Sequence, residues 1–167
     1  MTEELFKAIL PIMGVVVGFF LSSGLGWLQP HRKIKTHWHA IRAEMTLCKE
    51  KTETLLETKP PVLSPLYRFP VVAVQTAYPI LLTEGVLNEQ ESLAVSRYSS
   101  QVGDINRGLD FAASRTMADD MDGLKKEYGR LILKTEALLS EQDGHPSVFE
   151  AAKTIVDGKL LLWREFL

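Results

Sequence analysis

Three histidines and the single cysteine lie close together in the sequence and are the first residues to consider as metal ligands. They are His31, His37, His39 and Cys48. His37 and His39 are two residues apart, which on a helix turns their side chains about 200° away from each other. Ligands on one helix are usually three or four residues apart. We therefore expect no metal and no cofactor here, and the lone cysteine excludes an internal disulfide.

An acidic cluster before a glycine invites comparison with a calcium-binding loop. The cluster comprises Asp119, Asp120 and Asp122, and the glycine is Gly123. Aligning this glycine with the glycine of such a loop places Gly129 where the loop requires a glutamate. The comparison fails. Acidic residues in the first turn of a helix, which the helix dipole favours, explain the cluster better.

Arg32 and His37 are separated by four residues, which matches the loose Arg-x4–6-His pattern of HEPN-type ribonucleases. These ribonucleases are also helical bundles. However, the pair directly follows a long apolar run, where basic residues are expected as a topology signal. The chain has no Gly-rich phosphate loop, no G-x-S-x-G and no H-E-x-x-H motif. We expect a protein that is not an enzyme, with a HEPN-like ribonuclease as the alternative.

Composition favours one folded domain with an accessory segment. The chain has 167 residues, of which 46% are apolar and 24% charged, as in ordinary globular proteins. Charge is unevenly distributed, because residues 29–51 hold six basic and two acidic side chains and residues 52–167 hold 12 and 17. The mildly acidic body predicts no nucleic-acid partner. No motif identifies a small-molecule substrate.

Residues 9–28 form a run of 20 uncharged residues. At about 1.5 Å per residue a helix of this length spans roughly 30 Å, the thickness of a bilayer core. The leader before it contains two acids and one lysine, unlike a signal peptide, although cleavage near Ser22 would give an exported soluble bundle. The run predicts a retained transmembrane helix.

The flanks of this run predict its orientation and its interface residues. Basic residues concentrate on the C-terminal side, whereas the N-terminal side has only Lys7. The positive-inside rule therefore predicts a single-pass protein of the cytoplasmic (inner) membrane, with its N-terminus outside and its C-terminal domain in the cytoplasm. The expected membrane-interface residues are Trp27, Arg32, Lys33 and Lys35.

Four small residues recur at intervals of four along the same run, at Gly14, Gly18, Ser22 and Gly26. Such a stripe lets a second helix approach closely, as in G-x-x-x-G pairing. It predicts a pairing surface for a partner protein or a homo-oligomer. The alternative is that glycine is simply common in membrane helices.

The remaining chain is punctuated into helices, with a helix expected over about residues 36–58. Ser64 and Pro65 can begin a second helix that Pro79 ends or kinks, although the nearby valines give it some strand character. Capping boxes at Asn88, Thr116 and Ser147 predict three more helices. The expected fold is all-α: a short tail (1–8), one transmembrane helix (9–28), a basic linker (29–35) and a cytoplasmic helical bundle of four to five helices (36–167).

The apolar residues that recur at helical spacing predict the core of this bundle. The first two stripes are Trp38, Ile41, Met45, Cys48, Thr52 and Leu55, and then Val95, Tyr98, Val102, Ile105, Leu109 and Ala112. The last two are Met117, Met121, Leu124, Tyr128, Leu131, Thr135 and Leu138, and then Phe149, Ala152, Val156, Leu160 and Trp163. Asn106, beside the second stripe, is expected to cap or bridge helices or to face a partner.

Two segments carry a family resemblance: residues 39–45 (H-A-I-R-A-E-M) and residues 98–109 (Y-S-S-Q-V-G-D-I-N-R-G-L). Together with the apolar run and the proline-containing break, they resemble a group of uncharacterised bacterial single-pass membrane-anchored helical proteins over residues 9–112. The resemblance implies no activity and no catalytic residues. The expected function is a membrane-anchored interaction or scaffold module.

Overall fold

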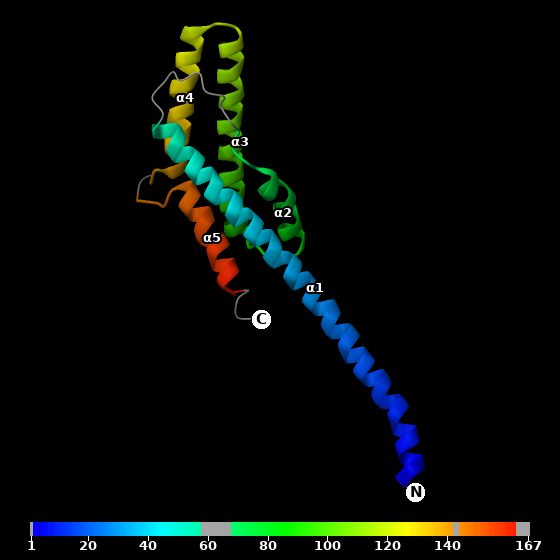
Figure 1. The fold of residues 1–167 in the computed structure, drawn as a ribbon. Coiled ribbons are helices and arrows are strands. Elements are labelled where there is room, and N and C mark those ends of the chain that lie inside the picture. The colour runs from blue at the N-terminus through cyan, green and yellow to red at the C-terminus, as the bar shows by residue number, and fades with distance from the viewer. Residues whose placement is uncertain (1, 58–67, 142–143, 163–167) are drawn as a thin grey trace. The chain divides into compact units, whose positions relative to one another are not determined.

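The structure, a computed structural model, describes the backbone of residues 2–57, 68–141 and 144–162. Side chains are described in these ranges from residue 32 onward, and before it only at positions 13, 15, 17 and 18. Every regular element of these ranges is an α-helix, which confirms the all-α prediction. The helices are α1 (Thr2–Glu57), α2 (Val72–Thr83), α3 (Glu89–Met117), α4 (Met121–Leu139) and α5 (Val148–Leu162) (Figure 1).

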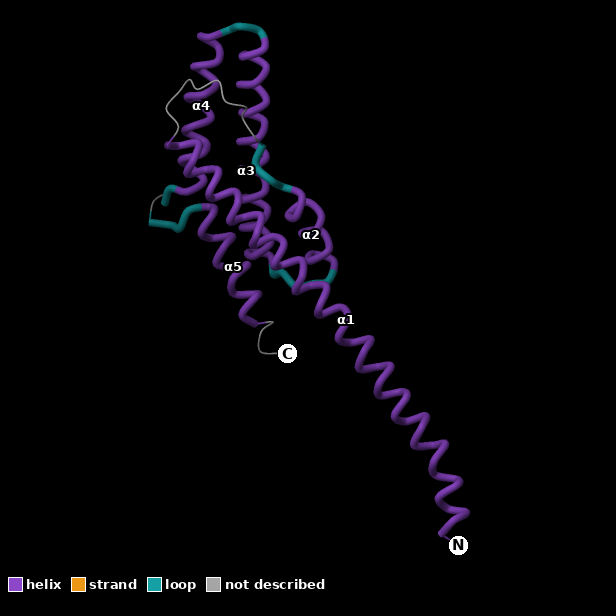
Figure 2. Tube along the Cα trace, viewed as in Figure 1, coloured by secondary structure: helices purple, strands orange, loops and turns teal. Residues whose placement is uncertain are grey.

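The chain divides into two compact units, Met1–Thr36 and His37–Leu167. The first unit is helical and contains the N-terminal part of α1. In the second unit, α3 and α4 form an antiparallel hairpin, and α3 also packs against α2 and α5 (Figures 1 and 2). The predicted bundle is therefore present, and its core lies along one face of each helix.

The predicted core stripes are buried almost throughout. On α1 and α3 they are Trp38, Ile41, Met45, Cys48, Thr52, Leu55, Val95, Tyr98, Val102, Ile105, Leu109 and Ala112. On α4 and α5 they are Leu124, Tyr128, Leu131, Thr135, Leu138, Phe149, Ala152, Val156 and Leu160. Met117 and Met121 are exposed, contrary to prediction, because they flank the turn between α3 and α4. Trp163 lies outside the described residues.

The predicted transmembrane helix over residues 9–28 is corrected. A crossing needs about 20 consecutive, predominantly apolar residues in one helix. In the part of the chain that the structure describes, no helix has the length and apolar character for a bilayer crossing. This finding also overturns the predicted single-pass location in the cytoplasmic membrane.

Residues 29–35, predicted as a linker, are helical, because α1 continues through Pro30 to Glu57. A proline inside a helix loses one backbone hydrogen bond and crowds the carbonyl four residues before it, but its φ near −65° is compatible with the helix, so a helix can continue through it at a cost of about 3 kcal/mol. The same reason accounts for α2, which contains Pro79 and ends at Thr83. The expected start of α2 at Ser64 and Pro65 lies outside the described residues, and the valines after residue 71 are helical.

Two predicted caps are confirmed and one is corrected. Asn88 and Glu91 form a reciprocal capping box with two 2.9 Å bonds, and Ser147 Oγ accepts from Glu150 N at 3.1 Å. Helix α4, however, is capped by Asp120, whose carboxylate accepts from Gly123 N at 2.9 Å. Thr116 instead lies in the last turn of α3, and its hydroxyl donates to the carbonyl of Ala112. Thr116 therefore does not begin a helix.

Candidate functional site

The sequence-predicted pairing residues lie in the N-terminal part of α1, in the unit Met1–Thr36. Of the four, only Gly18 has a described environment, and a Cβ added there would meet nothing within 4 Å. For Gly14, Ser22 and Gly26, and for the interface residue Trp27, side chains lie outside the described residues. The pairing surface therefore stays a prediction, with open space at the one position that can be inspected.

The basic interface residues and the histidine candidates follow along the same helix. Arg32 and Lys33 are exposed, Lys35 is half-buried, and Arg32 accepts a hydrogen bond from the Thr36 hydroxyl at its carbonyl oxygen. His37 is half-buried. No group of three or more potential metal ligands occurs among the described residues. The pairing of Arg32 with His37 in ribonuclease chemistry stays a prediction.

Three apolar side chains near Gly18 are at least half exposed. Met13 is 59% exposed, Val15 72% and Val17 50%. Residues 13 and 17 share one side of the helix, whereas position 15 lies on another side, because successive residues turn by about 100°. Apolar surface is therefore exposed on more than one side of this helix, and nothing described within its unit covers it.

The bundle concentrates its polar contacts on a short segment before α2, residues 68–71, which we call the clamped segment. Phe69 is its buried anchor, with 3% of its surface exposed. The amide of Asn106, on α3, makes two bonds to Phe69: Oδ1 accepts from the backbone N–H at 2.7 Å, and Nδ2 donates to the carbonyl at 3.0 Å. The prediction that Asn106 bridges elements is thus confirmed in its geometry.

Glu44, on α1, caps α2 from a distance of about thirty residues in sequence. Its carboxylate accepts from the N–H of Ala73 at 2.6 Å and from that of Val74 at 3.0 Å. Helix α2 has Val71 at its own N-cap position and no side-chain cap there. Glu44 is only 6% exposed, so little water reaches this place, and the carboxylate takes the role of water as the acceptor for these N–H groups. Sequence reasoning missed this role, because no local pattern links Glu44 to α2.

Further side chains of α1 and α3 hold the clamped segment from both sides. From α1, the Cys48 thiol donates to the carbonyl of Pro70 at 3.3 Å and Lys51 Nζ donates to that of Arg68 at 2.7 Å. From α3, Asp110 accepts two bonds from the Arg68 guanidinium at 2.9 and 2.8 Å. Cys48, Lys51 and Asp110 thus hold the backbone and the Arg68 side chain of the clamped segment.

Cys48 and Tyr98 are buried together beneath this segment. Burial raises the pKa of the Cys48 thiol to about 11, so it stays protonated and unreactive at neutral pH. Burial also raises the pKa of Tyr98, and the nearby thiol adds to that effect. The Tyr98 hydroxyl has no hydrogen-bond partner within the described ranges. Both groups lack the access and the ionisation that a nucleophile needs.

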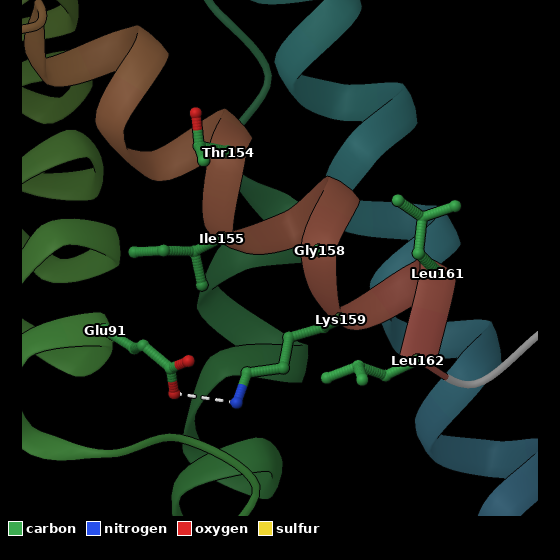
Figure 3. Close-up of a pocket in the computed structure, with 7 residues that line it drawn as sticks. All are labelled: Glu91, Thr154, Ile155, Gly158, Lys159, Leu161 and Leu162. Atoms are coloured by element: carbon green, nitrogen blue, oxygen red, sulfur yellow. Dashed lines mark ion pairs between the residues drawn. The ribbon is translucent and has the colours of Figure 1, made fainter.

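One open cavity of about 500 Å³ lies between α5 and the start of α3. Its lining is mostly apolar, with Ile155 and Leu162 at its sides, and its polar part is the ion pair of Glu91 and Lys159 at 2.7 Å (Figure 3). Lys159 Nζ also donates to the carbonyl of Val86 at 2.8 Å.

Burial alone raises the pKa of the Glu91 carboxyl, but the hydrogen bond from Lys159 and the Asn88 N–H outweigh it and hold the pKa below its usual value. The Glu91 carboxylate therefore stays ionised at neutral pH, and its bond to Lys159 ties α5 to the start of α3.

No protein family, curated protein or solved structure was found to match this chain. The resemblance to bacterial single-pass proteins thus stays a prediction, and any function must be argued from the residues themselves.

Proposed function

We propose that this protein is a helical interaction module that assembles with another protein chain through the N-terminal part of α1. The observation that carries the proposal is the exposure of Met13, Val15 and Val17 on more than one side of an uncharged helical stretch. A helix that is apolar on all sides is stable only when it is buried. Covering each of these side chains fully would contribute about 1.5–3 kcal/mol.

The polar chemistry of the bundle supports an interaction role over a catalytic one. Glu44 and Asn106 spend their hydrogen-bonding groups on backbone amides and carbonyls next to α2. Cys48 is held as a buried thiol that donates to a carbonyl. These groups hold a scaffold together, and the exposed apolar surface is what remains for a partner.

Site-specific photo-cross-linking tests the proposal in the cells that naturally carry the protein. A photoreactive phenylalanine derivative replaces Val15 or Val17 in the full chain, and the matched control replaces Leu133, an apolar residue of α4 that is 66% exposed. We expect a discrete protein adduct at positions 15 and 17 and none at 133, with mass spectrometry identifying the partner. If positions 15 and 17 give no adduct, the proposal is wrong.

A further inference from the structure

We propose that the partner is a second copy of this chain, and that the two N-terminal helices pair antiparallel about a twofold axis at Gly18. This inference rests on the proposed function, because it identifies what covers Val15, on the side of α1 that carries Gly18. Met13 and Val17 lie about 140° and 100° from Gly18, outside this pairing face. The argument uses the charges at the two ends of the apolar stretch, their position around the helix and the space at Gly18.

Opposite charges stand at equal distances from Gly18. Glu3 and Glu4 precede it by 15 and 14 residues, and Arg32 and Lys33 follow it by 14 and 15. In an antiparallel pair centred on Gly18, position 4 of one copy faces position 32 of the other, and position 3 faces position 33. Both ends of the pair then join acidic to basic residues. A parallel pair would place like charges side by side at both ends, which is repulsive.

These charges also lie on the same side of the helix as Gly18. With about 100° between successive residues, positions 4 and 32 fall about 40° from Gly18, on opposite flanks, and positions 3 and 33 fall about 60° from it. The backbone of α1 is helical over this whole range. This side of the helix thus carries acidic positions at one end, basic positions at the other and the apolar stretch between them; Lys7, about 20° from Gly18, adds one basic position at the acidic end.

The centre of this face lets a second backbone approach. Gly18 has no side chain, and a Cβ placed there would meet nothing within 4 Å. The small residues Gly14 and Ser22 lie four residues to each side and face each other in the antiparallel arrangement. Val15, 72% exposed, flanks the same face about 60° from Gly18 and is opposite position 21 of the other copy. The partner therefore covers exposed apolar surface where the backbones can come closest.

Disulfide cross-linking of the full chain tests orientation directly. The chain has one native cysteine, Cys48, which is fully buried, so introduced cysteines report without background. A disulfide needs Cα atoms within about 7 Å. In the antiparallel pair, the two copies of position 14 lie about 12 Å apart along the axis, whereas position 14 of one copy lies beside position 22 of the other. Mild oxidation should therefore link Gly14→Cys chains to Ser22→Cys chains, and neither to itself.

Two further variants keep the result interpretable. Gly18→Cys should self-link in either orientation and shows whether two copies pair at all. Val15→Cys mixed with Leu21→Cys repeats the orientation test with substitutions that leave the glycines intact. Efficient self-linking of Gly14→Cys would show a parallel pair, which overturns this inference and leaves the proposed function standing. Absence of any link, together with photo-adducts to a different protein, would also overturn the inference alone. Absence of both links and photo-adducts would overturn the two proposals together.

Discussion

Replacing Glu44 tests whether one buried carboxylate holds α2 in place. Glu44→Ala removes both acceptors of the Ala73 and Val74 N–H groups, which lie 2.6 and 3.0 Å from its oxygens. These two N–H groups lie in the first turn of a helix whose own N-cap residue, Val71, offers no side-chain acceptor. The substitution therefore leaves two donors without partners in a place that is almost closed to water.

The magnitude follows from these two bonds. A buried donor left without a partner costs about 1–3 kcal/mol, and water entering the vacated space recovers part of that. The lost charge at a helix N-terminus adds a further 0.3–1 kcal/mol or so. We expect Glu44→Ala to lower the free energy of unfolding by about 3 kcal/mol. Glu44→Gln, which keeps one acceptor and loses the charge, should cost about 2 kcal/mol.

Urea unfolding of the full chain, followed by circular dichroism at 222 nm, measures these losses. Glu50→Ala is the matched control, because Glu50 is an exposed glutamate on the same helix. Its side chain makes none of the bonds to α2, so the control should change the free energy by less than about 0.5 kcal/mol. Hydrogen exchange adds a local readout, since the amides of Ala73 and Val74 should lose protection in Glu44→Ala before those of α3. If Glu44→Ala and Glu50→Ala cost the same, the capping argument is wrong.

Predictions for three other residues follow. Tyr98→Ala should lower the free energy of unfolding by about 3–5 kcal/mol, because the side chain is only 2% exposed. Tyr98→Phe should change it by less than about 1 kcal/mol, because the hydroxyl has no partner among the described residues. Equal losses for the two variants in urea unfolding would contradict this prediction. Cys48 should resist a thiol reagent at pH 8 in the folded protein and react fully in urea. Burial raises the pKa of Cys48 from an unfolded value near 8.5 to about 11, so the thiol ionises in the unfolded chain before it ionises in the folded protein. The free energy of unfolding should therefore fall by about 3 kcal/mol as the pH rises from about 8.5 to 11, and an unchanged free energy over this range would refute the prediction. The pKa of Glu91 is lowered in the folded protein, so the ionised carboxylate stabilises the fold above about pH 4.3 and this stabilisation is lost in more acidic solution. Lys159→Met should make the decline of stability between about pH 5 and 3 less steep, and an unchanged decline would count against the ion pair.

Much of the bundle follows from local sequence signals. The capping box at Asn88 and the apolar residues after it define α3 because both signals depend on neighbours within one or two turns. Signals that compete within a few residues are harder to rank. Thr116 and Asp120 can both cap, and Asp120 prevails, since its carboxylate reaches Gly123 N while Thr116 remains within α3. The valines near position 72 favour strand by type, yet they form α2.

Tertiary contacts explain what the sequence did not predict. Glu44 caps α2 across 29 and 30 residues, and Asn106 binds Phe69 across 37 residues. No periodicity or spacing rule connects such positions, because their proximity exists only after α1 and α3 have packed. Asn106 was recognised as a possible bridge from its polar character beside an apolar stripe. Glu44 gave no signal, since an isolated glutamate on a helix usually faces solvent.

Residues 39–45 and 98–109 both help to hold the backbone that leads into α2. The first, residues 39–45, contains Glu44, and the second, residues 98–109, contains Asn106; each makes two hydrogen bonds that place the backbone entering α2. Substituting either residue should disturb stability first, whatever the protein does, because these bonds face inward. Val15 and Val17 of α1 differ from Glu44 and Asn106, because their side chains are exposed and make no described contribution to packing. A substitution that changes assembly while leaving the unfolding of the bundle unaltered should therefore be found at positions 15–18, and that difference separates the residues that hold the bundle together from the proposed interaction surface.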